Sequence, residues 1–155
     1  MTYLVVYYSR TGNNRAIAKT IAEKLSAEID EIIDKKKRLG KLGWLLAGRD
    51  SRARKLTEIE FQKNPQDYDT IIIGSPIWAW NPIPPVRTYL QQVDLSGKRV
   101  AFFICSKSEA YIKIFPQLVE MTPKSDHIGT FGILEEHFLN KDYSTDLEKF
   151  IEKIK

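Results

Sequence analysis

Short runs of valine, isoleucine, tyrosine and phenylalanine alternate along this chain with segments that have the apolar periodicity of helices. Such alternation is typical of a parallel sheet whose strands are covered on both faces by the connecting helices. Right-handed crossovers leave few other topologies for five strands in a chain of this length. We therefore expect an α/β fold with an open, doubly wound sheet. The predicted strands are Tyr3 to Tyr8, Ile29 to Ile33, Thr70 to Gly74, Arg99 to Cys105 and His127 to Ile133.

The segments between these strands predict helices. The clearest is Asn14 to Leu25, whose apolar residues recur every four positions and whose start can be capped by Asn13 or Asn14. Three glycines interrupt the apolar residues from Leu39 to Ala53, so that region predicts a short helix with loops. We interpret Glu135 and Glu136 as part of a solvated loop. The other predicted helices are Pro84 or Pro85 to Val93, Glu109 to Met121 and Ser144 to Ile154.

The composition, 43% hydrophobic and 28% charged over 155 residues, predicts one folded domain spanning residues 1–155. No stretch approaches the ~18 uninterrupted apolar residues of a membrane span, and the first residues do not resemble a secretion signal. We therefore expect a cytoplasmic location. Cys105 is the only cysteine, which excludes an intrachain disulfide and a thiolate metal cluster.

The basic residues are distributed unevenly. The formal net charge is +4, yet residues 35–55 contain nine lysines and arginines and a single acid, Asp50. A basic insert that is only a solvated surface accounts for this excess. A dedicated docking patch for a partner is the alternative, because clustered charge also attracts a partner of opposite sign.

A polar segment joins the first predicted strand directly to the first predicted helix. The start of a helix offers unpaired N–H groups and a positive dipole end, which together suit a phosphate. Glycine allows a close approach of the backbone, and hydroxyl and amide side chains add donors. An ordinary capped strand-to-helix turn uses the same residue types, so both interpretations remain open. The segment consists of Ser9, Arg10, Thr11, Gly12, Asn13 and Asn14.

Three other phosphate-handling sites are excluded. Neither the Gly-x-Gly-x-x-Gly pattern of dinucleotide-binding proteins nor the P-loop pattern ending in Gly-Lys-Ser/Thr occurs at this position. A phospho-acceptor protein of the same topology needs acidic residues at the end of the first strand. Tyr7, Tyr8 and Ser9 supply none.

A second polar and aromatic segment, Gly74 to Asn81, follows the third predicted strand and leads into a proline-rich stretch. Proline stiffens a loop that cannot continue the strand. A core does not require two tryptophans at a strand end, whereas a flat aromatic ligand would explain them. We expect Trp78 to contact such a ligand. For Trp80, a ligand contact and a seal over the sheet edge are both open.

These two segments resemble the flavodoxin family. The first is similar to its phosphate motif, Thr/Ser-x-Thr-Gly-Asn-Thr/Asn, and DYDTIIIGSPIWAW is similar to its third strand and second flavin loop. The family has a flavodoxin-like, open, doubly wound five-stranded parallel sheet of order 2-1-3-4-5 with helices on both faces. Flavin mononucleotide (FMN) lies at its switch point, between the ends of strands 1 and 3. The resemblance therefore implies this fold and FMN as the cofactor.

The resemblance also implies roles for individual residues. The phosphate would be held by Ser9, Arg10, Thr11, Gly12, Asn13 and Asn14. The ring would be bordered by Ser75, Pro76, Ile77, Trp78, Ala79 and Trp80, with Trp78 stacked on it. The third flavin loop would use Cys105, Ser106, Lys107 and Tyr111, with Tyr111 as a second stacking ring. In that third loop the chain departs from the glycine-rich, acidic segment that is usual in the family.

The function implied is electron transfer through FMN, in which the flavin performs the chemistry and no catalytic side chain or metal is required. One alternative is a flavin-dependent reductase of a quinone or a porphyrin precursor on the same scaffold. Another is a cofactor-free interaction module that uses residues 35–55. The expected partner is a redox protein, acidic because that segment is basic. We expect neither a membrane span nor a nucleic acid partner.

Overall fold

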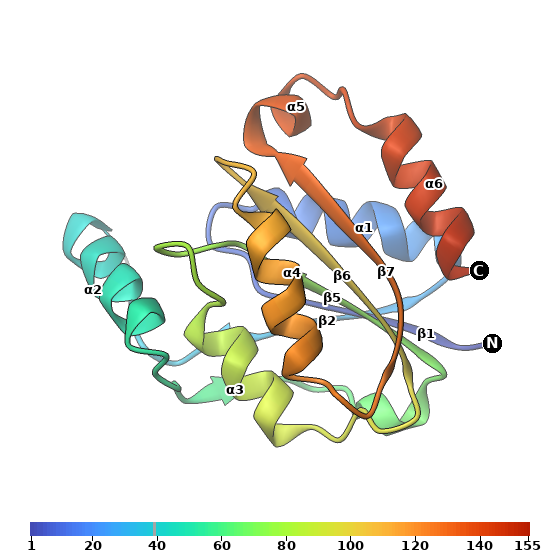
Figure 1. The fold of residues 1–155 in the computed structure, drawn as a ribbon, viewed down its shortest axis with the longest axis horizontal. Coiled ribbons are helices and arrows are strands. Elements are labelled where there is room, and N and C mark those ends of the chain that lie inside the picture. Colours follow the sequence, from blue (N-terminus) through green and yellow to red (C-terminus); the bar gives the residue numbers. More distant parts are fainter. Residues whose placement is uncertain (39) are drawn as a thin grey trace.

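A five-stranded parallel sheet forms the centre of the computed structural model, which describes residues 1–38 and 40–155 (Figure 1). Its order is β2-β1-β5-β6-β7, which is 2-1-3-4-5 when only these five strands are counted. All neighbouring strands are parallel. This confirms the predicted topology, and the strand ends differ from the predicted ones by at most two residues. The strands are β1 (Tyr3–Tyr7), β2 (Glu28–Glu31), β5 (Thr70–Ser75), β6 (Arg99–Ser106) and β7 (Asp126–Leu134).

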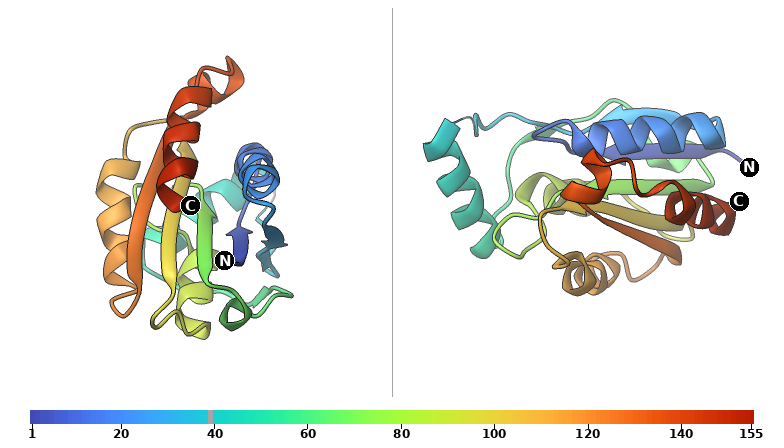
Figure 2. Two further views of the ribbon diagram at one scale, coloured as in Figure 1. Left: turned by 90° about the vertical axis from the view of Figure 1, so that its right-hand side faces the viewer. Right: turned by 90° about the horizontal axis from the view of Figure 1, so that it is seen from above.

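Two helices cover each face of the sheet (Figure 2). Successive residues of a strand point to opposite faces, so Val5 of β1 packs with α1 and α6, whereas Leu4 and Val6 pack with α3 and α4. All four helices were predicted, with ends within two residues. They are α1 (Asn13–Leu25), α3 (Pro84–Gln92), α4 (Tyr111–Glu120) and α6 (Ser144–Ile154). No helix among the described residues has the length and apolar character needed to cross a membrane.

The sequence did not predict several small elements. β3 (Ile33–Asp34) and β4 (Ile59–Glu60) pair in an antiparallel ribbon beside the main sheet, and the 3₁₀ helix η1 (Pro65–Asp67) precedes β5. The interpretation of Glu135 and Glu136 as a solvated loop is wrong, because they form the first turn of α5 (Glu135–Leu139).

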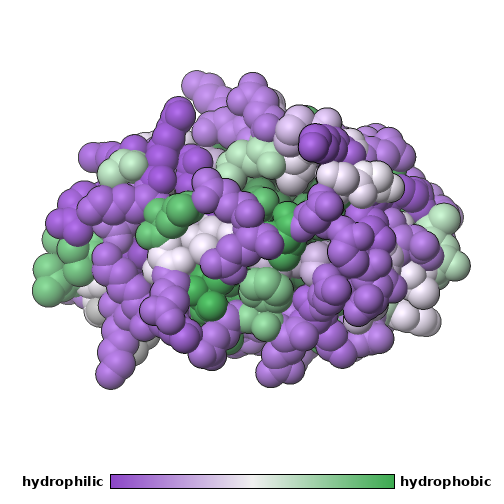
Figure 3. Space-filling model, turned by 90° about the horizontal axis from the view of Figure 1, so that it is seen from below, coloured by the Kyte–Doolittle hydropathy of each residue, from purple (hydrophilic) through white to green (hydrophobic). Residues whose placement is uncertain are grey.

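α2 (Gly40–Arg52) is a continuous helix of 13 residues, longer than the interrupted helix that we predicted. Leu39, where the predicted segment begins, lies outside the described residues. Gly43 does not break α2; a Cβ there would lie 2.3 Å from the backbone of Arg38, so glycine permits a close contact. α2 lies at the end of the molecule where β1, β5 and β6 finish (Figure 1). Figure 3 shows apolar surface at that end, on the left.

Candidate cofactor site

The loop after β1 turns sharply into α1. Gly12, at the N-cap of α1, has φ 98°, a left-handed conformation that glycine adopts without strain. The Oγ of Ser9 accepts a hydrogen bond of 3.0 Å from the N–H of Gly12, which folds the loop back on itself. Gly12 also leaves open space, since nothing lies within 4 Å of a Cβ built there.

The first N–H groups of α1 are available to a ligand. No side chain caps this helix, so the expectation that Asn13 or Asn14 caps it is wrong. Within residues 1–38 and 40–155, the backbone N–H groups of Asn13, Asn14 and Arg15 donate to no protein group. Because they stand at the positive end of the helix dipole, they form an arrangement that suits an anion.

Asn14 joins this loop to the loop after β6. Its side chain is buried, and its Oδ1 accepts a hydrogen bond of 3.1 Å from the N–H of Cys105. Burial, with Glu135 nearby, raises the pKa of Cys105 to about 12, so the thiol stays protonated and unreactive at neutral pH. The side chain of Asn13 also has a protein partner, since its Nδ2 donates to Oε1 of Glu135 at 3.1 Å.

The loop after β5 contains a tight turn with unfavourable backbone angles. The N–H of Asn81 donates to the carbonyl oxygen of Trp78 at 3.1 Å. Between them, Ala79 and Trp80 have φ values of 49° and 55°. Positive φ at both central positions is the type I′ pattern, which glycine and asparagine prefer. Strain of this kind is concentrated at functional sites.

The two tryptophans of this turn differ in exposure. Trp78 is only 8% exposed; its ring meets Tyr8 edge-on, at 5.4 Å between centroids, and the guanidinium carbon of Arg38 lies 5.6 Å from its centroid. Trp80 is 69% exposed. We expected Trp78 to face a ligand, but the structure encloses Trp78 in the protein and presents Trp80.

The basic segment is more than a solvated surface. Arg38 is buried, and it donates from Nε to Asp34 at 2.6 Å and from Nη1 to Asp50 at 2.8 Å. Lys36 also donates to Asp50, at 2.6 Å. Burial alone would raise the pKa of Asp50, but the bonds from Lys36 and Arg38 hold that pKa well below its ordinary value. This cluster joins α2 to β3 beside Trp78, and no local sequence pattern predicted it.

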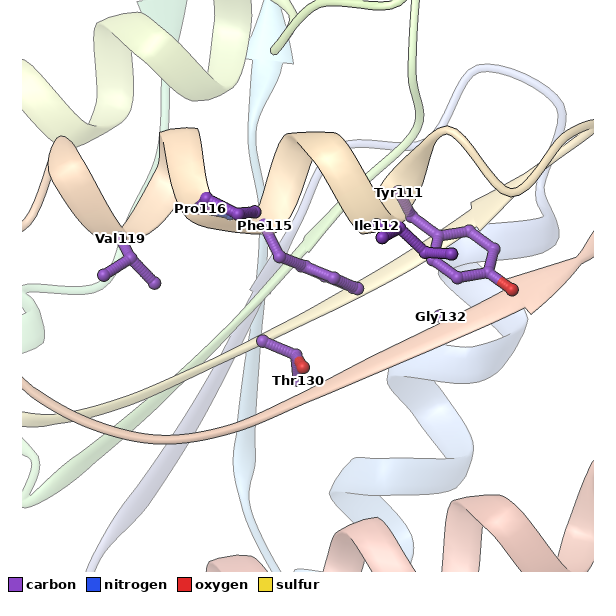
Figure 4. A pocket seen from close by; sticks show the side chains of 7 residues that line it. All are labelled: Tyr111, Ile112, Phe115, Pro116, Val119, Thr130 and Gly132. Atoms are coloured by element: carbon purple, nitrogen blue, oxygen red, sulfur yellow. The ribbon is translucent and has the colours of Figure 1, made fainter.

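In the loop after β6, the Oγ of Ser106 donates to the carbonyl of Ser108 at 2.6 Å, and Lys107 is exposed. Tyr111, at the start of α4, packs over β7: a Cβ at Gly132 would lie 2.3 Å from its ring. Tyr111 therefore lies against the edge strand instead of standing free as a stacking ring. Tyr111 lines an apolar hollow of about 510 Å³ between α4 and β7. Figure 4 shows it there with the other lining residues, Ile112, Phe115, Pro116, Val119, Thr130 and Gly132.

The three loops meet at one edge of the sheet. The register pairs Tyr7 of β1 with Gly74 of β5, and Gly74 in turn with Phe103 of β6, so the strands end side by side. This arrangement places the donors of α1, the exposed Trp80 and the loop after β6 around the carboxyl ends of adjacent strands. A ligand that carries both a phosphate and a flat ring fits this chemistry.

Comparisons with known proteins agree with this geometry. A flavoprotein from Lactobacillus acidophilus NCFM, solved in complex with FMN, has a TM-score of 0.74 and 23% sequence identity, covering 90% of this chain and 97% of that one. An uncharacterized protein of Archaeoglobus fulgidus is 30% identical over 99 residues, 64% of this chain and 62% of that protein. Flavodoxin 1 of Salmonella typhimurium is 25% identical over 118 residues, 72% of this chain and 53% of that protein.

The chain thus spans less than two thirds of the length of these two curated relatives. The model of the family described as Flavodoxin, in contrast, matches almost the whole chain, from residue 2 to residue 154. With the strand order and the loop positions described above, the chain belongs to the flavodoxin family.

Proposed function

We propose that this protein binds FMN at the loops after β1, β5 and β6 and carries electrons through it. The observation that supports the proposal best is the set of free N–H donors at Asn13, Asn14 and Arg15, at the same sheet edge as the exposed Trp80. The donors suit a phosphate dianion and the indole suits a flat ring. When bound, FMN supplies the one- and two-electron chemistry. The protein holds the phosphate, borders the ring and limits access to it.

The position of each loop around the sheet edge suggests which part of FMN its residues contact. The phosphate is held by Ser9, Arg10, Thr11, Gly12, Asn13 and Asn14. The ring is bordered by Ser75, Pro76, Ile77, Ala79 and Trp80, by Cys105 and Ser106 at the end of β6, and by Lys107 and Tyr111 after it. Trp80 takes the stacking role that the resemblance implied for Trp78, and Trp78 packs on Tyr8 inside the protein.

Titration of the apoprotein with FMN and with riboflavin tests the binding. Because the phosphate receives charge-assisted hydrogen bonds, we expect FMN to bind at least about 10-fold more tightly than riboflavin. Equal affinities would contradict the phosphate site, and binding of neither ligand would favour an interaction module without cofactor. Steady turnover of a nicotinamide cofactor and a quinone without an added reductase would favour the alternative of a self-sufficient reductase.

We further propose an acidic redox protein as the partner, docking beside the cofactor site. Nine bases in residues 35–55 exceed the four carboxylates that contact them, those of Asp34, Asp50, Glu58 and Glu60. Four exposed bases make no ion pair within the described part of the chain: Lys37, Lys41, Arg52 and Arg54. This surplus of positive charge supports attraction of an acidic surface.

A further inference from the structure

α2 contacts two of the loops to which we assign FMN, the phosphate loop after β1 and the ring loop after β5. At its start, Nη2 of Arg10 in the phosphate loop donates to the carbonyl of Gly40 at 3.4 Å. Two turns later, a Cβ built on Gly48 would lie 3.7 Å from the Cβ of Ala79 in the ring loop. Residues 40–48 of α2 therefore run along one side of the proposed cofactor site.

Trp44 lies midway between these two contacts. Residues four apart lie on the same side of a helix, so Trp44 shares a stripe with Gly40 and Gly48. Since the two glycines carry no side chain, the indole of Trp44 is the only side chain on that stripe between Gly40 and Gly48. It is 64% exposed, whereas Ala47 and Asp50, which face the protein, are buried.

Two exposed tryptophans thus stand on two elements that touch each other. Trp44 is 64% exposed on α2 and Trp80 is 69% exposed on the ring loop, on either side of the contact between Gly48 and Ala79. A single exposed apolar side chain is ordinary, but exposed apolar side chains gathered on touching elements mark surfaces that meet a ligand or a partner. A flat aromatic ligand between α2 and the loop would bury both indoles.

We propose that α2 is a wall of the cofactor site and that Trp44 contacts the flavin ring together with Trp80. This inference rests on the proposed function, because it requires that FMN binds at these loops. An indole against the ring adds apolar burial and aromatic contact, and it quenches flavin fluorescence. The negative face of the indole also disfavours the anionic reduced flavin, so Trp44 lowers the midpoint potential.

The test compares the wild type with Trp44→Ala, Trp44→Phe and Leu45→Ala. Leu45 is a matched control: it is 60% exposed on the same helix, and its position one residue later turns its side chain about 100° from that of Trp44 around the helix axis. Each apoprotein is titrated with FMN and with riboflavin, and the emission and midpoint potential of the bound FMN are recorded. Circular dichroism confirms that each variant is folded.

We expect Trp44→Ala to weaken FMN and riboflavin alike, by about fivefold to tenfold, because the contact is to the ring that both ligands share. Its bound flavin should be brighter and its potential higher. Trp44→Phe should restore most of the affinity, and Leu45→Ala should match the wild type.

If Trp44→Ala and Leu45→Ala both match the wild type in affinity, emission and potential, the inference is overturned while FMN binding stands. Equal weakening by both variants would also overturn it, since the effect would then belong to the helix and not to the indole. A wild type that binds neither flavin would overturn the proposed function, and this inference with it.

Discussion

Ala79 and Trp80 occupy a turn that suits neither residue. A left-handed conformation costs an L-residue roughly 1–2 kcal/mol, and glycine relieves that cost. We therefore expect Ala79→Gly to raise the free energy of unfolding by roughly 0.5–1 kcal/mol in equilibrium urea unfolding. Ala16→Gly, at an exposed position inside α1, should lower it by about the same amount. A loss of stability in both variants would show that the turn is not strained.

Thr11 is exposed in the loop after β1, to which we assign the phosphate, so its replacement tests phosphate recognition apart from ring recognition. Replacing it by alanine removes a charge-assisted hydrogen bond worth about 1.5 kcal/mol or more, so Thr11→Ala should bind FMN ~10-fold more weakly and riboflavin as before. Asn14→Ala is the informative contrast in the same fluorescence titration. Because Asn14 also bonds to Cys105, its loss should weaken both ligands. An equal effect of Thr11→Ala on both ligands would contradict its role.

At the scale of the element, the attachment of α2 depends on pH through Asp50. Its pKa in the folded protein is below the ordinary 3.8, so Asp50 contributes stability above that pH and loses it as the pH falls toward the folded value. Asp50→Asn should cost about 3 kcal/mol at pH 7 and flatten the decline in stability below pH 4, measured by urea unfolding. Asp146→Asn, on an exposed pair, should change stability by less than about 0.5 kcal/mol. Similar curves for the two variants would contradict this role.

The elements also show which parts of the fold can be predicted from the sequence alone. The main strands and four helices were predictable, because their apolar patterns are local and strong. Gly43 and Gly48 suggested an interrupted helix, yet Gly43 lets α2 pack closely on the backbone of Arg38, and Gly48 lies beside Ala79, which is distant in the chain. Trp78 and Trp80 are two residues apart, and only the geometry of the turn decides which one is exposed. The ion pairs of Arg38 depend on tertiary packing, which no local pattern reports.

At the scale of the whole molecule, the positive surplus around α2 should govern the encounter with an acidic partner. Reversing Lys41 and Arg52 to glutamate should slow reduction by an acidic redox protein about tenfold at low salt, in stopped-flow measurements. The difference should vanish near 1 M salt, where the screening length is ~3 Å, and flavin content should not change. Arg38 is unsuitable for this test because it is buried.

Lys124 and Lys153 provide the control for that charge reversal. Lys124 precedes β7 and Lys153 packs near Gly129 early in β7, so both lie toward the opposite end of the sheet. Reversal of these two lysines should leave the rate nearly unchanged. Equal slowing by both double variants would mean that net charge, and not the surface around α2, controls the encounter.

The hydrogen bond from Cys105 to Asn14 joins residues that are 91 positions apart. A ribosome makes the phosphate loop early, while the strand that completes it is still to be synthesised. A nascent chain of about 90 residues can pair β1 with β2 and β5, but the amide of Asn14 has no partner until β6 has emerged. We therefore expect FMN capture to follow the synthesis of β6, and chains truncated before β6 should remain free of flavin even when FMN is abundant.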